Sequence, residues 1–513
     1  MPTKELFIEA VTKGYTFKGE AAVLGCGMIN GVVEKEAVVK LPLRTMNRHG
    51  LIAGATGTGK TKTLQVISEI LSDASVPVLM MDIKGDLSGI AMAGASNQKL
   101  EERCSNLGIT YNANGYPVEL LTLSNENGVR LRATVIEFGP ILLSKILGLN
   151  DTQAGLVSML YKYADDNALP LLDLKDFTKL LQFAGDEGKQ EIEKLYGKIS
   201  TTSTGTILRK VIELQQQGAD IFFGEPSFDV NDLMRIHNDG RGVINILRVT
   251  DMQSRPKLFS TFMLQLLAEL YAVCPEEGDL DKPKLILFID EAHLLFNEAS
   301  DALLDQIETV IKLIRSKGVG IFFCTQNPQD IPAPILSQLG LKVQHALRAF
   351  TAADRKTIKQ AAENFPLSDF YKTDELLTQM GIGEAMITLL NEKGIPTPLV
   401  HTMLYPPKSR MDILTDAEIT NIVNNSKLAA RYNKVIDNES AYEILNKKIA
   451  TATQEQAVEV ATEKKADKEE SFLDNPIVKQ VGRTAASILT RTLLGALGLT
   501  ATSSRKKKTG WFS

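Results

Sequence analysis

The residues at 54–61 have the types and spacing of a phosphate-binding loop. They read Gly54, Ala55, Thr56, Gly57, Thr58, Gly59, Lys60 and Thr61, and Lys62 follows. Glycines let the backbone fold around phosphates so that several N–H groups point inward, and the following helix adds its dipole. We expect Lys60 to reach the β- and γ-phosphates of a nucleoside triphosphate and the Thr61 hydroxyl to bind Mg²⁺. Residues 54–62 are therefore the predicted nucleotide-binding set.

A second segment has the composition of a catalytic strand end. The apolar run Leu285–Ile289 is followed directly by Asp290 and Glu291. Asp290 would hold Mg²⁺ through water, and Glu291 would polarise the water that attacks the γ-phosphate. Acidic pairs after strands are common, so this interpretation depends on the phosphate-binding loop upstream. Together the two segments predict hydrolysis of a triphosphate as well as its binding.

Two further strand ends carry polar side chains. Gln326 follows the apolar run 320–325, and Asp82 ends the run that starts at Val78. The amide of Gln326 could contact the γ-phosphate or orient the attacking water, or it could simply complete a turn. A carboxylate at the C-terminal edge of a parallel sheet lies in the ligand crevice. Asp82 is therefore either a partner of the catalytic water or a turn-forming residue.

The negative charge on a transferring phosphoryl group often requires an arginine, which a neighbouring subunit can supply. Arg315, on a predicted helix between Glu291 and Gln326, is the first candidate. Arg348 is the second. The two assignments are not mutually exclusive, and either residue could instead be an ordinary surface arginine.

The elements that must position these residues alternate along the chain. Leu51–Ala53 reads as a strand, Lys62–Ser72 has helical apolar spacing, and Val78–Asp82 is again a buried strand. Further strand signals at 242–247, 285–290 and 320–325 are separated by helical patterns at 259–273 and 302–316. This alternation predicts an α/β fold with a mainly parallel sheet.

Changes in composition and in apolar spacing divide the chain into a core with several additional segments. We predict a short β-rich N-terminal segment at 1–45, a core at 46–139 and 237–408, an α-helical insertion at 140–236, a helical region at 409–454, a charged linker at 455–477, and an amphipathic helix with a basic tail at 478–513. The last helix could dock on its own domain or on another subunit. It could also contact a membrane surface or nucleic acid.

Composition limits the possible partners and compartments. A net charge of −5 predicts no whole-surface attraction to nucleic acid, so a DNA-binding surface would be a local patch or a channel lining. The four cysteines share no metal-ligand spacing and read as buried hydrophobes in a reducing compartment. No signal peptide and no apolar run long enough to span a bilayer is evident. These features predict a cytoplasmic protein.

The combination of motifs resembles the HerA–FtsK superfamily, and within it the bacterial HerA-like proteins. The resemblance covers roughly residues 20–408. It rests on the segments 47–61, 82–89, 290–296, 314–320 and 325–332, with support from 344–351 and 383–385.

The resemblance implies a RecA-like ATPase core that assembles as a homo-oligomeric ring, usually a hexamer, with ATP between subunits. Relatives of this kind translocate on double-stranded DNA. Lys60, Thr61, Asp290, Glu291 and Gln326 match the ATPase positions of the superfamily. Arg315 matches the arginine finger of HerA relatives, whereas FtsK relatives place theirs further along, near Gln344. Archaeal HerA carries a substantial N-terminal β-barrel, and only some forty residues precede the loop strand here, which puts a comparable nuclease partnership in doubt.

Two other functions compete with a DNA translocase. A ring ATPase acting on an unidentified protein partner, or serving as a nucleotide-gated scaffold, would suit the acidic net charge and the helical insertion. A small-molecule kinase fits poorly because Glu291 directly after Asp290 suits activation of water better than transfer to an acceptor.

Overall fold

The computed structural model describes residues 3–251, 255–278, 280–296, 301–349, 351–451 and 454. The chain divides into two compact units, the first made of residues 1–131 and 228–433 and the second of residues 132–227 and those from 434 onward. The predicted linker at 455–477 and the amphipathic helix with its basic tail at 478–513 lie outside the described residues.

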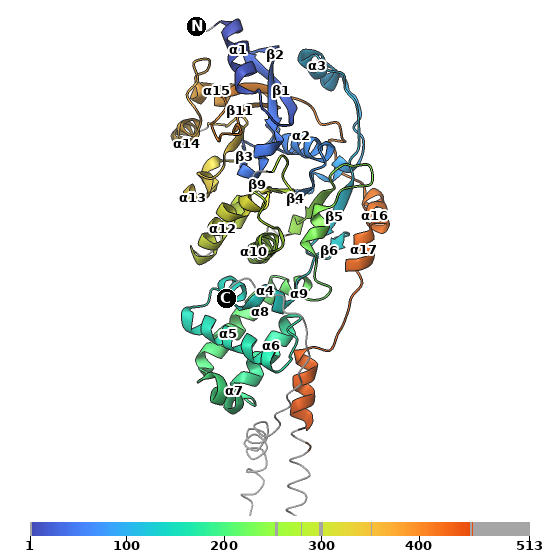
Figure 1. Cartoon of the computed structure of the whole chain (residues 1–513), viewed down its shortest axis with the longest axis vertical. Coiled ribbons are helices and arrows are strands. Elements are labelled where there is room, and N and C mark those ends of the chain that lie inside the picture. The colour runs from blue at the N-terminus through green and yellow to red at the C-terminus, as the bar shows by residue number, and fades with distance from the viewer. Residues whose placement is uncertain are drawn as a thin grey trace, which may run out of the picture. The chain divides into compact units, whose positions relative to one another are not determined.

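The first unit is built on a single twelve-stranded sheet (Figure 1). Its strand order is β2-β1-β12-β11-β10-β3-β9-β8-β4-β7-β5-β6. The strands are β1 (Ala21–Ile29), β2 (Val32–Pro42), β3 (Gly50–Ala53), β4 (Val78–Asp82), β5 (Val118–Thr122), β6 (Val129–Arg130), β7 (Ile244–Arg248), β8 (Leu285–Ile289), β9 (Val319–Thr325), β10 (Leu341–Gln344), β11 (Glu384–Thr388) and β12 (Val400–Leu404).

The sheet has a parallel part and an antiparallel extension. From β10 to β6 every neighbouring pair is parallel, whereas β11, β12, β1 and β2 pair antiparallel beyond β10. The central strands β3, β4, β8 and β9 are buried along their whole length, as expected for continuous apolar runs covered on both faces. The predicted α/β fold with a mainly parallel sheet is therefore confirmed.

Helices connect the strands of the first unit. They are α1 (Lys4–Gly14), α2 (Lys60–Asp73), α3 (Gln98–Leu107), α10 (Pro256–Val273), α11 (His293–Phe296), α12 (Asp301–Ile314), α13 (Ala333–Leu336), α14 (Ala352–Glu363), α15 (Thr373–Gln379), α16 (Asp416–Asn425) and α17 (Lys427–Tyr432). Short 3-10 turns are η1 (Leu43–Arg48), η2 (Ser88–Ala91), η3 (Val230–Met234), η5 (Arg315–Lys317) and η6 (Pro328–Asp330).

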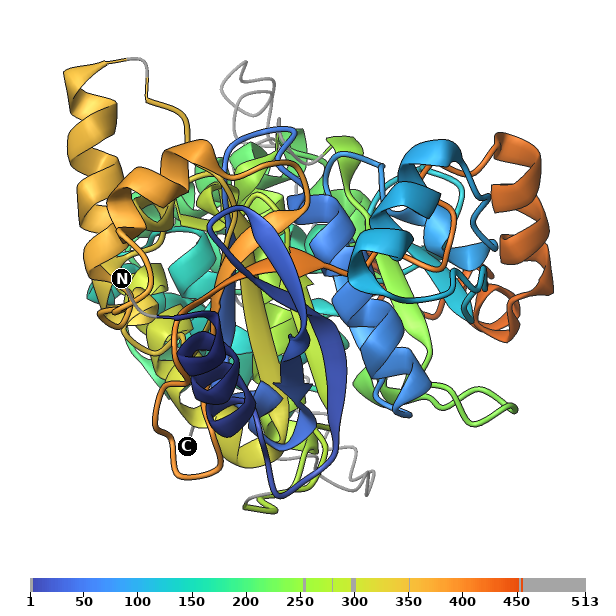
Figure 2. The same cartoon turned by 90° about the horizontal axis from the view of Figure 1, so that it is seen from above.

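The N-terminal segment differs from the prediction of a β-rich lead-in at 1–45. Residues 4–14 form α1, which is capped by the Thr3 side chain and buries Phe7 and Val11. The strands that follow, β1 and β2, join the main sheet instead of forming a separate element, and α1 lies beside them (Figure 2). The helical spacing of Phe7 and Val11 was the signal that the prediction missed.

The second unit is helical. It contains α4 (Val135–Ile146), α5 (Asp151–Asp166), α6 (Leu174–Gly185), α7 (Lys189–Tyr196), α8 (Thr201–Gln216) and α9 (Ala219–Phe222), which gather into one group in Figure 1. Capping boxes begin α4, α5 and α6, so local sequence fixes where these helices start. Residues 434–451, which the prediction grouped with 409–433, belong to this unit.

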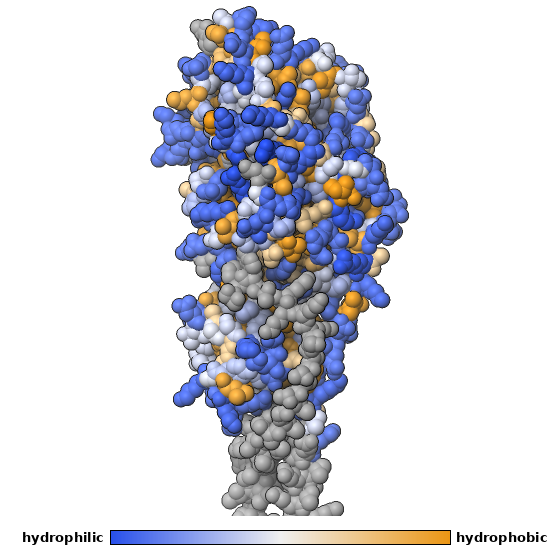
Figure 3. Space-filling model, viewed as in Figure 1, coloured by the Kyte–Doolittle hydropathy of each residue, from blue (hydrophilic) through white to orange (hydrophobic). Residues whose placement is uncertain are grey.

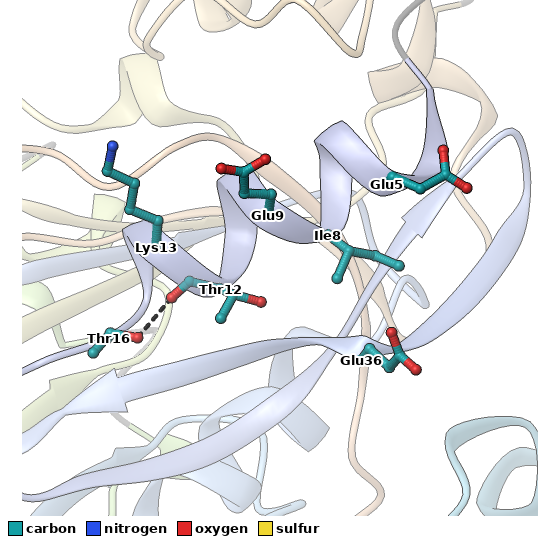
Figure 4. A pocket seen from close by; sticks show the side chains of 7 residues that line it. All are labelled: Glu5, Ile8, Glu9, Thr12, Lys13, Thr16 and Glu36. Carbon is teal, nitrogen blue, oxygen red and sulfur yellow. Dashed lines mark hydrogen bonds between the residues drawn. The ribbon is translucent and has the colours of Figure 1, made fainter.

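A shallow pocket lies between α1 and β2 in the first unit (Figure 4). It is lined by Glu5, Ile8, Glu9, Thr12, Lys13, Thr16 and Glu36, none of them a predicted site residue. Hydrophilic residues dominate the face shown in Figure 3, with apolar residues scattered among them. No helix among the described residues is both long and apolar enough to cross a membrane.

Candidate active site

The phosphate-binding loop connects the end of β3 to the start of α2. Its glycines at 54, 57 and 59 all have positive φ angles, of 153°, 77° and 116°. L-residues rarely adopt such values. A β-carbon at position 54 would also lie 2.5 Å from the β-carbon of His345. Glycine is therefore required at position 54 by both its backbone conformation and its neighbour.

Lys60 points its ammonium group into this loop. Only 7% of the residue is exposed. Its Nζ donates hydrogen bonds to the carbonyl oxygens of Gly54, at 2.6 Å, and Ala55, at 3.3 Å. Burial lowers the pKa of Lys60, and the nearby ammonium group of Lys84 lowers it further. A buried cation of this kind favours an anionic partner, since an isolated charge is costly to bury.

His345, just after β10, supports the loop from behind. Its backbone N–H donates to the carbonyl of Ala53, and its Nδ1 lies 2.9 Å from the carbonyl oxygen of Glu384. Because a carbonyl only accepts, Nδ1 carries the proton, and Nε2 accepts from the Thr63 hydroxyl on α2 at 2.8 Å. Burial lowers the pKa of His345 to about 4, so the imidazole is neutral at neutral pH.

The antiparallel extension contributes a second support through Gly383, next to β11. The backbone N–H of Gly383 donates to the carbonyl of Thr58 at 2.9 Å. The carbonyl of Gly383 accepts from the guanidinium of Arg103 on α3. The adjacent Glu384 is paired with His401, on β12, at 2.9 Å. The β11–β12 part of the sheet thus holds the loop in place.

Asp290 and Glu291 follow β8 at the same edge of the sheet. They are only 6% and 5% exposed. Burial raises the pKa of Asp290 to about 6, an effect that Lys84 opposes and the neighbouring Glu291 carboxylate strengthens. Glu291 has a φ of 45°, in the left-handed region that non-glycine residues rarely occupy. Strained backbone of this kind clusters at functional sites.

Asp82, at the end of β4, builds the loop beside this pair. Its Oδ1 accepts from the amides of Gly85 and Asp86, and its Oδ2 accepts from the amide of Leu87. Burial raises the pKa of Asp82 to about 7. Of the two sequence-based interpretations, these hydrogen bonds match the turn-forming one. The turn presents Lys84, whose Nζ forms an ion pair with Oε1 of Glu291.

Gln326 follows β9, which lies between β3 and β8 in the sheet. Its side chain is exposed. The backbone on either side is fixed, because Asp330 accepts from the Thr325 hydroxyl at 2.5 Å and from the Asn327 amide at 3.1 Å. The backbone N–H of Gly54 donates to the carbonyl of Thr325, so Gln326 emerges next to the phosphate-binding loop.

The two candidate arginines lie at opposite ends of the parallel strands. Arg315 is at the N-terminal ends, called here the N-terminal edge of the sheet, and Arg348 is at the C-terminal ends, the C-terminal edge. Arg348 is exposed and comes shortly after β10, where the carbonyl of Ala346 accepts from the amide of Ala55 in the loop. Arg315 is exposed in η5, immediately before β9. The seven residues of β9 span about 20 Å at about 3.3 Å per residue. Arg315 is therefore about a strand length away from the phosphate-binding loop of its own chain.

Buried polar groups fix the segment that carries Arg315. His49, before β3, accepts from the Ile321 amide through Nδ1 and bonds through Nε2 to the carbonyl of Ile311 on α12. Asn47 donates to the carbonyl of Arg315 itself. Burial lowers the pKa of His49 to about 4. The strand that leads into the phosphate-binding loop is thus tied to α12, the helix that ends directly before Arg315.

Within the described residues no group of three or more His, Cys, Asp or Glu side chains is arranged to hold a metal ion. The two predicted donors are the hydroxyl of Thr61, in the first turn of α2, and the carboxylate of Asp290, directly after β8. Such a sparse set fits Mg²⁺, which usually takes one or two protein ligands and completes its shell with waters and substrate phosphates.

Comparison with known proteins identifies the family. Residues 29–488 match the model of the helicase HerA-like C-terminal family, which is most of the chain. The chain belongs to this family. Its fold is that of the RecA-like P-loop proteins of the HerA–FtsK superfamily, as its motifs indicated.

Curated relatives are distant in sequence. The DNA double-strand break repair helicase HerA of Saccharolobus solfataricus is 24% identical over 70% of this chain and 65% of its own length. The HerA of Sulfurisphaera tokodaii is 24% identical over 70% of the chain and 66% of its own length. The DNA import protein CedB of Sulfolobus acidocaldarius is 23% identical over 70% of the chain and 52% of its own length. The chain thus spans less than two thirds of the length of each.

Solved structures share the fold. The bacterial conjugative coupling protein TrwB, in an unbound form lacking its N-terminal segment, superposes with a TM-score of 0.51 at 13% identity, covering 79% of this chain and 94% of that one. TrwB in complex with a non-hydrolysable ATP analogue gives 0.50 at 13% identity, covering 78% and 99%.

The structure brings most of the predicted residues together at one edge. Lys60, Asp290 and Glu291 interact electrostatically, and Gln326 and Arg348 emerge beside the loop. Arg315 alone lies elsewhere. Sequence reasoning gave no role to Lys84, His345 and Gly383, although all three fall in stretches that carried the family resemblance.

Proposed function

We propose that this HerA-like ATPase hydrolyses ATP to ADP and phosphate at sites shared between subunits of a homo-oligomeric ring, expected to be a hexamer, and uses the energy to move along double-stranded DNA. The proposal of a shared site is supported by the position of Arg315 in the fold. An exposed arginine about a strand length from its own phosphate-binding loop can serve only the loop of another subunit.

The residues of one chain supply most of the chemistry. The amides of residues 54–61 and the Lys60 ammonium bind the β- and γ-phosphates. Lys62, in the first turn of α2, contributes its backbone to this helix start, whereas its Nζ donates to the carbonyl of Met411. Thr61 and Asp290 would hold Mg²⁺, which neutralises charge on the phosphate oxygens when bound. Glu291 takes the proton of the attacking water, and Gln326 orients that water or contacts the γ-phosphate. Arg315 of a neighbour, with Arg348 as the alternative, stabilises the charge of the transition state.

DNA as the substrate is supported by the relatives that the chain resembles, which include a DNA repair helicase and a DNA import protein. A net charge of −5 requires that any DNA-binding surface be local, such as the lining of a ring. The second candidate function, a ring ATPase that acts on a protein, is favoured by this acidic charge and by the separate helical unit at 132–227.

The deciding experiment measures the ATPase rate with and without linear duplex DNA, across a salt series, on protein whose oligomeric state is known from light scattering. We expect several-fold stimulation by DNA that weakens steeply as salt rises. Lys60→Ala should abolish both rates and controls for contaminating ATPases. Equal rates with and without DNA at every salt concentration would exclude the translocase. ATP-dependent recovery of a protein partner from nuclease-treated lysate would then support the second function.

A further inference from the structure

Lys84 lies at the centre of the candidate active site, yet none of the roles above uses it. It occupies the turn after β4, and the Asp82 carboxylate fixes that turn through three backbone amides. Because Asp82 is fully buried, the backbone position of Lys84 is set by the core of the sheet. The flexible side chain of Lys84, which is 34% exposed, can therefore change its contacts by rotation while its backbone stays in place.

In this structure the partner of Lys84 is the proposed general base. Lys84 Nζ forms an ion pair with Oε1 of Glu291, whose side chain is 6% exposed. His293 lies on the other oxygen, with Nδ1 at 3.3 Å from Oε2. Both carboxylate oxygens of Glu291 are thus already in contact with basic side chains, which leaves less room for a water molecule at either of them. The contact with Lys84 therefore restrains the residue that must accept a proton from water.

The charge of the surroundings makes this contact exchangeable. Lys84 is close enough to Lys60 to lower the pKa of Lys60, and the carboxylates of Asp290, Glu291 and Asp86 all attract Lys84. A γ-phosphate held by Lys60 brings additional negative charge next to Lys84. ADP, which lacks that group, does not.

We propose that Lys84 is a γ-phosphate-binding residue that exchanges partners, leaving Glu291 when ATP binds. The exchange has two effects. It adds a cation to the terminal phosphate, so the site favours ATP over ADP, and it frees the Glu291 carboxylate only when there is a γ-phosphate to attack. This inference rests on the proposed ATPase function but not on DNA translocation.

Binding measurements test the first effect. The affinities of the full-length protein for the non-hydrolysable analogue AMP-PNP and for ADP, both with Mg²⁺, would be measured by displacement of a fluorescent nucleotide. Lys84→Met should weaken AMP-PNP binding at least about tenfold and ADP binding less than about twofold, as expected for loss of one charge-assisted contact. Lys84→Arg should retain most of the preference. Lys60→Met should weaken both nucleotides, and Lys99→Met, at an exposed position on α3, should change neither.

A double-mutant cycle tests the exchange itself. Glu291→Gln removes the competing partner of Lys84, so it should strengthen AMP-PNP binding several-fold without changing ADP binding. In the variant that carries both Lys84→Met and Glu291→Gln this gain should vanish. If the gain persists without Lys84, it comes from removal of negative charge alone and the exchange is wrong.

Other outcomes are equally decisive. Equal weakening of AMP-PNP and ADP in Lys84→Met, or no weakening of either, would overturn the assignment, and retained ADP binding shows that the variant is folded. A wild-type protein that binds neither nucleotide would refute the proposed ATPase function instead.

Discussion

The C-terminal and N-terminal edges of the parallel sheet differ in how deeply their charged side chains are buried and in the charges that they present. At the C-terminal edge Lys60, Asp290 and Glu291 are almost fully buried, and they form a cluster of opposite charges around the phosphate-binding loop. At the N-terminal edge Arg315 stands exposed, and buried groups behind it fix only its backbone. One edge thus holds an anion site and the other presents the exposed guanidinium group of Arg315. A head-to-tail arrangement of copies would join the two, and such heterologous contacts close into rings when the rotation allows.

The largest effect is expected from a substitution at the N-terminal edge, because it removes the proposed arginine finger. Arg315→Ala should lower kcat by about 1,000-fold or more while leaving ATP affinity nearly unchanged, since an arginine finger acts mainly on transition-state charge. Mixing this variant with Lys60→Ala protein should restore about a quarter of the sites in a randomly mixed ring, because each composite site then has one intact edge from each chain. Full activity of Arg315→Ala alone, or no recovery on mixing, would contradict the shared site.

The second prediction concerns the C-terminal edge alone. Glu291→Gln should lower the turnover rate by about 100-fold or more, because the amide cannot accept a proton from water. ATP binding should be retained and oligomers stabilised, as judged by light scattering in the presence of ATP. Near-normal hydrolysis would remove Glu291 from its role. Mixing with Lys60→Ala protein should not restore this variant, in contrast to Arg315→Ala.

The third prediction compares the buried histidines of the two edges, His49 and His345. Their pKa values are lowered to about 4 in the folded protein, against about 6.5 in the unfolded chain. Between these values the unfolded chain binds protons that the folded chain does not, so both histidines make the protein less stable as pH falls from 6.5 towards 4. Each histidine should therefore lower the unfolding free energy by about 2 kcal/mol between pH 7 and pH 5. A variant with Gln in place of either histidine should lack this contribution, so its unfolding free energy should fall by about 2 kcal/mol less over the same range, as measured by urea unfolding.

Nucleotide binding should distinguish these two histidines. His345→Gln should also raise the KM for ATP, because His345 holds the Thr63 hydroxyl and the strand that leads into the loop. His49→Gln should leave the KM unchanged and lower kcat instead, since His49 ties α12 to the sheet on the Arg315 side. The same kinetic effect from both variants would mean that the edges are not independent.

The smallest expected effect belongs to Arg348. It lies on the same edge as the loop of its own chain, where Lys60 already supplies a cation. Arg348→Ala should therefore lower kcat by less than about tenfold. A loss as large as that of Arg315→Ala would instead indicate that Arg348 is the arginine finger. The N-terminal edge would then not be needed to complete the site.

The parts of the site that sequence could predict are those encoded locally. The loop at 54–61 and the strands that end at Asp82, Ile289 and Thr325 were recognisable because glycine, lysine and buried apolar runs occur in continuous stretches. The parallel sheet followed from the alternation of these strands with helices. The helix at 4–14 was also encoded locally, but its short apolar stripe next to strongly β-like runs was overlooked.

What could not be predicted depends on contacts between distant segments. The pairing of β10 with β11 brings Glu384 to His345, and the turn at Gly383 meets Thr58 from more than three hundred residues away in sequence. The ion pair of Lys84 with Glu291 likewise joins the ends of two strands, β4 and β8, that are neighbours only in the folded sheet. Strand order, which no local pattern specifies, decides all of these contacts.

The left-handed backbone at Glu291 has a consequence for protein engineering. A residue with a β-carbon costs about 1–2 kcal/mol in this conformation, whereas glycine adopts it freely and asparagine tolerates it better than most. Selection for heat resistance alone would therefore enrich glycine or asparagine at 291 and discard turnover. Thermostable variants of this chain should be sought elsewhere, and enrichment of such substitutions at 291 would itself reveal where the protein sacrifices stability for catalysis.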